Sequence, residues 1–90
     1  MVVLAVPFLF GKLKGAVYDF PETGDILPMH THDEATAHIT IVAAGKMQIT
    51  VNGVTQEYEC GKVVDLPANQ EHEFVALEPE SRIVNIQKNL

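Results

Sequence analysis

The chain has 90 residues, a length that makes one domain (residues 1–90) with a small core. Hydrophobic residues make up 47% of it, which favours a folded domain over a disordered segment. The formal net charge is −6 and the six Lys and Arg residues are scattered, so the composition argues against nucleic acids and anionic membranes as partners.

The chain opens on an apolar stretch, MVVLAVPFLF, at residues 1–10. This stretch lacks the basic start and the small-residue cleavage site of a signal peptide, and Pro7 interrupts it. It is also shorter than the roughly 20 residues that a helix needs to cross a membrane. We therefore predict an edge strand, or a strand given to a neighbouring subunit. The absence of a targeting signal leads us to expect a cytoplasmic protein.

Short stretches rich in β-branched and aromatic residues follow, and no long helical pattern appears. Residues 46–53 alternate between apolar and polar side chains and end on Asn52-Gly53, a pair typical of a type I′ hairpin turn. About seven to nine short strands joined by turns indicate an all-β sandwich or barrel. The clearest expected strands are residues 16–20, 37–45, 46–53, 54–61, 63–67, 72–77 and 82–87.

The single cysteine, Cys60, excludes an internal disulfide and suits a reducing compartment. It stands just before a glycine, without a histidine nearby in the sequence. We expect a half-buried residue at the end of a strand rather than a nucleophile.

The four histidines are candidates for a metal site. His30 and His32 are two residues apart, so on a strand they point to the same face, and His38 shares their parity. His72 opens the expected strand 72–77 and is able to approach from across the sheet. Imidazole suits Zn, Cu, Fe or Ni. Histidines are also common as surface or hydrogen-bonded residues, so both interpretations stay open on these residues alone.

The continuation of the strand from His38 gives a further expectation. If the strand runs without a bulge from Thr36, then Thr36, His38, Thr40 and Val42 line the same face.

Glycine and proline residues at fixed distances frame these histidines. Five residues separate Gly24 from His30-Thr-His32, and six residues separate His38 from Gly45. This pattern, followed by a second one, resembles the two sequence motifs of the cupin superfamily. The residues between the motifs, 46–60, give the short spacing of compact cupins. The matching positions are Gly24, His30, His32, Gly45, Gly61, Pro67 and His72.

Three positions depart from the family pattern. His38 stands where the first motif has glutamate, and Ala76 stands where the second motif ends on asparagine. Asn69 replaces the glycine of the second motif, but asparagine tolerates a left-handed backbone, so the turn can form.

With histidine in place of glutamate, the resemblance implies a centre of four histidines. Their neutral imidazoles leave the charge of a divalent ion uncompensated, which favours an anionic or enolisable oxygen ligand. The ion itself, one divalent transition metal (Zn, Ni, Fe, Mn or Cu), is not identified by the sequence. The implied ligands are His30, His32, His38 and His72.

Five further residues are candidates for the lining of the pocket, with ordinary barrel packing or a place on the rim as the alternative for each. No residue is assigned a catalytic role. The candidates are Gln48, Thr50, Tyr58, Phe74 and Arg82.

The resemblance implies a small jelly-roll sandwich or barrel that forms a homodimer through its outer strands, with the apolar N-terminal segment at the contact. Cupins with three- or four-histidine centres include dioxygenases, cyclases, isomerases and small proteins that ketonise unsaturated uronates. One hypothesis is therefore an enzyme whose metal polarises a small polar substrate with carbonyl, carboxylate or enol oxygens. The alternative is a non-catalytic module that binds a metal or a small ligand. The number of open coordination positions at the metal distinguishes the two.

Overall fold

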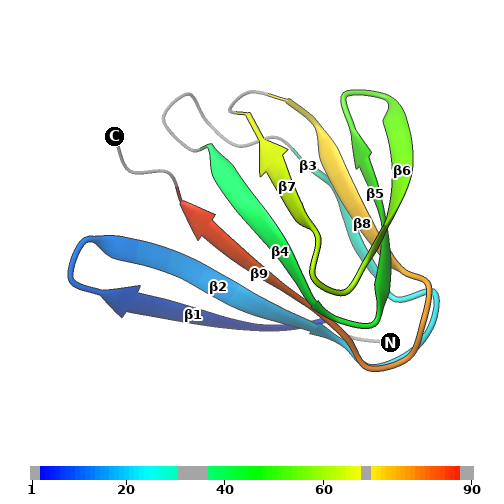
Figure 1. The fold of residues 1–90 in the computed structure, drawn as a ribbon, viewed down its shortest axis with the longest axis horizontal. Helices are drawn as coiled ribbons and strands as arrows, with labels where there is room; N and C mark the ends of the chain where they lie inside the picture. The colour runs from blue at the N-terminus through cyan, green and yellow to red at the C-terminus, as the bar shows by residue number, and fades with distance from the viewer. Residues whose placement is uncertain (1–2, 31–36, 68–69, 88–90) are drawn as a thin grey trace.

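The computed structural model describes residues 3–30, 37–67 and 70–87. These residues form nine β-strands, joined by turns and loops (Figure 1). The strands are β1 (Leu4–Phe10), β2 (Leu13–Phe20), β3 (Ile26–His30), β4 (His38–Ala44), β5 (Lys46–Val51), β6 (Val54–Glu59), β7 (Val63–Leu66), β8 (His72–Ala76) and β9 (Ser81–Gln87).

The strands form two antiparallel sheets. The five-stranded sheet has the order β1-β2-β9-β4-β7, and the four-stranded sheet has the order β3-β8-β5-β6. Strands that are distant in the sequence therefore lie side by side, as β2 and β9 do. This arrangement confirms the predicted all-β fold, a jelly-roll sandwich (Figure 1).

The interior of the sandwich is built from alternating side chains. In β5, Met47 and Ile49 are buried while Gln48 and Thr50 face outward, as the period of two requires. The buried apolar residues form one core between the sheets. They are Phe20, Val42, Met47, Ile49, Val64, Leu66, Phe74, Ala76 and Ile83.

The turn between β5 and β6 has the predicted geometry. Asn52 and Gly53 both have positive φ angles, 49° and 82°, as a type I′ turn requires. Val51, the last residue of β5, pairs with Val54, the first residue of β6, so the turn consists of two residues.

The N-terminal segment forms an edge strand, as predicted. β1 pairs with β2 along its whole length, and Gly11, with φ of 63°, lies in the turn that joins them. The hairpin of β1 and β2 extends to the side of the sandwich in Figure 1. Across residues 3–30, 37–67 and 70–87, no helix is long and apolar enough to cross a membrane.

The prediction for Cys60 was wrong in one respect. The residue follows β6, but it is exposed rather than half-buried. Its Sγ lies 3.3 Å from the carbonyl oxygen of Ala43.

Candidate metal and ligand site

The strand topology brings three histidines to one end of the sandwich. His30 ends β3, His38 begins β4 and His72 begins β8. These strand ends lie together at the top of Figure 1. The Cα atoms of His30 and His72 are register partners across β3 and β8. His38 approaches from the other sheet, so the candidate ligands come from both layers.

His38 faces the interior. It is only 7% exposed, and the buried residues of β4 alternate from it through Thr40 to Val42. For these three residues the predicted parity is confirmed, whereas Thr36 lies outside the described residues. Across the sheet, His38 pairs with Leu66 of β7 and Gln87 of β9.

His72 is held in one orientation and one tautomer. Its side chain is 2% exposed, and its ring lies 5.6 Å from the ring of Phe74. Its Nδ1 lies 3.1 Å from the carbonyl oxygen of Gln70. Because a carbonyl oxygen can only accept, Nδ1 carries the hydrogen, and the lone pair of the neutral ring is on Nε2. Metal-binding histidines in proteins are commonly oriented in this way.

The complete four-histidine centre stays a prediction. Among the residues that the structure describes, no group of three or more His, Cys, Asp or Glu side chains is placed to hold a metal ion. His32 lies outside the described residues, and for His30 the backbone alone is described. Two predicted ligands, His38 and His72, therefore have described side chains.

A cavity of about 230 Å³ adjoins His38 on the inner face of the five-stranded sheet. Sequence reasoning did not select the other residues that line it. The alternation of β9, in which Asn85 falls on the same face as Ile83, was the available signal, since it puts a polar side chain among the inward positions. The lining residues are Pro7, Lys14, Gly15, Ala16, Tyr18, His38, Asn85 and Gln87.

Three of the five pocket candidates from the sequence lie on the neighbouring strands β5 and β6, outside the cavity lining. Thr50 faces outward on β5, and its Oγ1 lies 2.8 Å from Oγ1 of Thr55. Gln48 faces outward beside it on the same strand. Tyr58 packs partly against the core, and its hydroxyl donates to Oε1 of Gln56 at 2.7 Å.

The other two candidates have different surroundings. Phe74 is fully buried in the core and contacts His72. Arg82 faces outward near the opposite end of β9, where its Nε donates to Oδ1 of Asp19 at 2.6 Å. This hydrogen bond, with the charge of Asp19, raises the pKa of Arg82 above its usual value. Arg82 also lines a depression of about 380 Å³ at that end.

Comparison with known proteins supports the pattern of glycines and histidines. A family model described as Cupin domain matches residues 16–84. The chain belongs to the cupin family. A search of curated protein sequences finds no match.

Solved structures share the fold of this cupin. KdgF from Halomonas sp. is 22% identical, with a TM-score of 0.84, over 94% of this chain and 76% of that one. The cupin domain of Cnp3 from Schizosaccharomyces pombe is 14% identical, with a TM-score of 0.83, over 100% and 69% of the two chains. The Cupin_2 domain of an XRE family transcriptional regulator from Enterobacter cloacae is 13% identical, with a TM-score of 0.83, over 100% and 99%.

Proposed function

We propose that this cupin holds one divalent transition metal ion with four histidines and binds a small polar molecule beside it. The observation that carries the proposal is that two buried histidines, His38 and His72, begin strands of different sheets at the end of the sandwich where β3 also ends. The proposed ligands are His30, His32, His38 and His72.

The chemistry of the two described ligands fits a metal. A neutral imidazole is a common ligand of Zn, Cu, Fe and Ni. His72 has its lone pair on Nε2 because Nδ1 donates to the carbonyl oxygen of Gln70. When bound, the metal supplies a Lewis acid able to polarise a carbonyl, carboxylate or enol oxygen.

A second candidate function is a non-catalytic module that binds a metal or a small ligand. Among the described residues that line the cavity beside His38 there is no Asp or Glu, so none of them offers a carboxylate as a general base. The Enterobacter cloacae structure with this fold is a domain of a transcriptional regulator, which supports a role outside catalysis. The cytoplasmic location stays a prediction.

Metal content tests the first proposal. The purified protein should carry about one transition metal ion per chain by elemental analysis. His32→Ala and His72→Ala should each lose the metal, while Gln48→Ala, on the outer face of β5, should retain it. The proposal fails if the wild-type protein contains no metal and binds no added Ni, Zn, Fe or Mn.

The coordination number separates the two functions. The absorption spectrum of the Co²⁺-substituted protein distinguishes a closed tetrahedral site from a five- or six-coordinate one. A closed site supports the binding module, whereas open positions filled by water support the enzyme.

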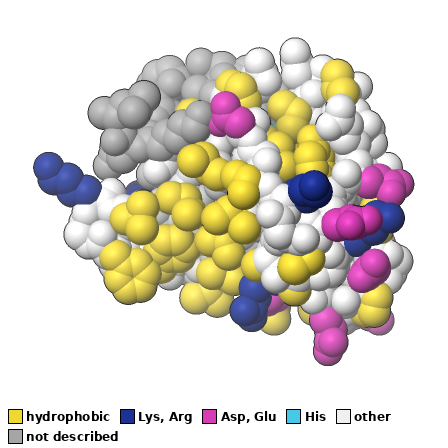
Figure 2. All heavy atoms as spheres, in the orientation of Figure 1, with side chains coloured by type: hydrophobic (Ala, Val, Ile, Leu, Met, Phe, Trp, Pro, Cys, Tyr) yellow, Lys and Arg dark blue, Asp and Glu magenta, His cyan; other side chains and the backbone are white. Residues whose placement is uncertain are grey.

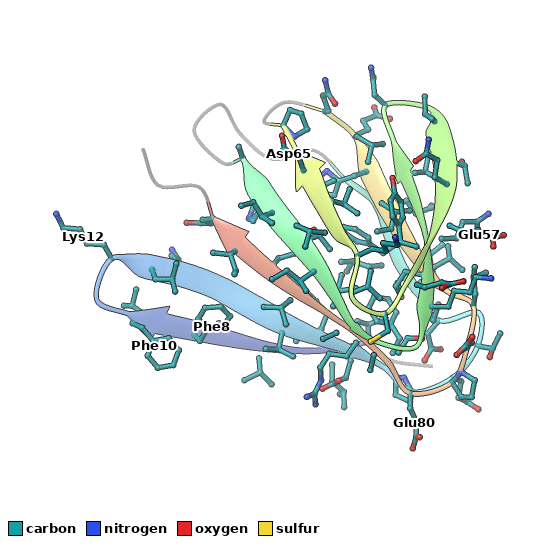
Figure 3. The ribbon with its side chains drawn as sticks, viewed as in Figure 1. Phe8, Phe10, Lys12, Glu57, Asp65 and Glu80 are labelled. Carbon is teal, nitrogen blue, oxygen red and sulfur yellow. The ribbon has the colours of Figure 1, made fainter. Side chains whose placement is uncertain are left out.

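We also propose that two copies of the chain pair through the outer face of the five-stranded sheet. A row of β-branched residues crosses all five strands of this face without a polar residue. Figure 2 shows hydrophobic side chains gathered over this part of the molecule, and Phe8 and Phe10 lie along β1 in Figure 3. The row consists of Val6, Val17, Val84, Ile41 and Val63.

The size of the face favours a second copy as its partner. Five of its apolar side chains are about half exposed or more, and they present on the order of 500 Å² of apolar surface. This area is more than half of the ~800 Å² that each partner buries in a standard interface. Asp19 and Arg82, which lie near one end of this face, form an ion pair and so neutralise each other. The five residues are Leu4, Val6, Phe10, Leu13 and Val63.

A further inference from the structure

The cavity beside His38 is built by strands that are distant in the sequence. Ala16 of β2 pairs with Asn85 of β9, and Gln87 of β9 pairs with His38 of β4. The inward side chains of β2, β9 and β4 therefore form one continuous wall. Lys14 is next to Ala16 on the same face of β2, at the exposed rim of the cavity.

The lining of the cavity is rich in hydrogen-bond donors. Thr40 donates its hydroxyl hydrogen to Oδ1 of Asn85 at 2.5 Å, and both residues are buried. This bond fixes the orientation of the Asn85 amide, so its Nδ2 is the group left to donate. Tyr18 contributes a phenolic hydroxyl, and Lys14 contributes an ammonium group with three hydrogens.

The charge of the lining is positive, in contrast to the protein as a whole. The chain has a formal net charge of −6, yet the one charged residue among the described residues that line the cavity is Lys14. An anion in the cavity would therefore meet a cation and neutral donors among these described residues, and no carboxylate from them. Hydrogen bonds between charged partners are about twice as strong as neutral ones.

We propose that this cavity binds the carboxylate of a small molecule, with Lys14 as its charged partner and Tyr18 and Asn85 as further donors. The inference rests on the proposed function, because it places the anion beside His38 of the metal centre. The cavity volume of about 230 Å³ is below the ~300–1,000 Å³ of sites for drug-sized ligands, so the ligand has few heavy atoms. Because His38 lines the cavity, a ligand bound there would lie beside the proposed metal centre.

Binding of pyruvate to the ¹⁵N-labelled protein, followed by NMR chemical-shift changes, tests the inference. Lys14→Gln keeps a polar side chain of similar length but removes the charge. It should weaken pyruvate binding at least about tenfold, as expected for the loss of a charge-assisted hydrogen bond. Tyr18→Phe should weaken it less. Hydroxyacetone, which has the same carbon chain but a hydroxyl group in place of the carboxylate, should bind Lys14→Gln and wild type alike.

Lys62→Gln is the matched control, since it changes the net charge equally at an exposed lysine outside the cavity lining. The inference is overturned if Lys14→Gln and Lys62→Gln bind pyruvate equally, or if the wild-type protein shows no shifts with millimolar pyruvate. Metal affinity, measured separately by calorimetry, should be unchanged in Lys14→Gln. If the wild-type protein binds no metal, only the proposed metal centre is refuted. The pyruvate titration tests the cavity separately.

Discussion

His72 donates its Nδ1 hydrogen to the carbonyl oxygen of Gln70, two residues before it, at 3.1 Å. The bond selects one tautomer of a buried ring at the start of β8 and leaves Nε2 as the basic nitrogen. Any ligand of this histidine therefore competes with a proton for Nε2. This relationship sets the expected pH dependence of the site.

Metal should be released as the pH falls below about 6, because each ligand histidine must be neutral and the ordinary pKa of histidine is about 6.5. The measurement is the metal retained after gel filtration at a series of pH values. Circular dichroism at each pH checks that the fold persists. Metal that stays bound down to roughly pH 4 would contradict ligation by histidine.

His38 occupies the position at which the cupin motif has glutamate, so His38→Glu tests whether a metal ion stabilises a carboxylate at this position. The side chain is only 7% exposed, and a carboxylate there is costly without a compensating cation. We expect the metal-free variant to unfold about 5–15 °C below wild type. Added metal should raise its unfolding temperature by more than it raises that of wild type.

His38→Gln provides the control for His38→Glu, since glutamine has the same shape without the charge. Its unfolding temperature should depend less on metal than that of the glutamate variant. Equal responses of the two variants to added metal would show that position 38 does not contact the ion.

Much of the sandwich could be predicted from local patterns. The alternation in residues 46–51 identified β5, and Asn52-Gly53 identified its turn. In β4, parity correctly grouped His38 with Thr40. In these strands one face is buried and the other is not, so the sequence carries a period of two.

The cavity could not be predicted in the same way. Lys14 and Tyr18 reach the neighbourhood of His38 only because β2 pairs with β9 and β9 pairs with β4. Such pairing between distant strands has no local signal in a single sequence. The sequence of residues 1–10 also does not indicate which side of the strand faces the interior, because β1 is apolar on both sides.

Thr40→Val should destabilise the fold by about 1–3 kcal/mol. The substitution keeps the shape of the side chain but removes the donor to the Asn85 amide, leaving Oδ1 buried without that hydrogen bond. Thr50→Val is the matched control, since its bond to Thr55 is exposed and its loss should cost no more than about 0.5 kcal/mol. Urea denaturation measures both. Equal effects would show that the buried hydrogen bond adds nothing.

Gly45→Ala should destabilise the protein more than Gly11→Ala. Both glycines have positive φ, 71° and 63°, so alanine is strained at each, by roughly 1–2 kcal/mol. At Gly45 an added Cβ would also overlap the side chain and backbone of Ser81, whereas at Gly11 it meets open space. We expect an additional loss of about 1–3 kcal/mol at Gly45. Chemical denaturation with similar midpoints for the two variants would contradict the close approach of Ser81.

Val6→Lys should convert the proposed dimer into a monomer. Val6 is 59% exposed at the edge of the apolar row, and a lysine there would bring a charge among these apolar side chains. Val54→Lys is the matched control, because Val54 is 60% exposed but belongs to the other sheet. Light scattering coupled to size exclusion measures the mass, which is 9.9 kDa for one chain. Wild type and Val54→Lys should both give twice this value, and Val6→Lys should give the single-chain mass. A wild-type monomer, or a Val6→Lys dimer as tight as wild type, would refute pairing through this face.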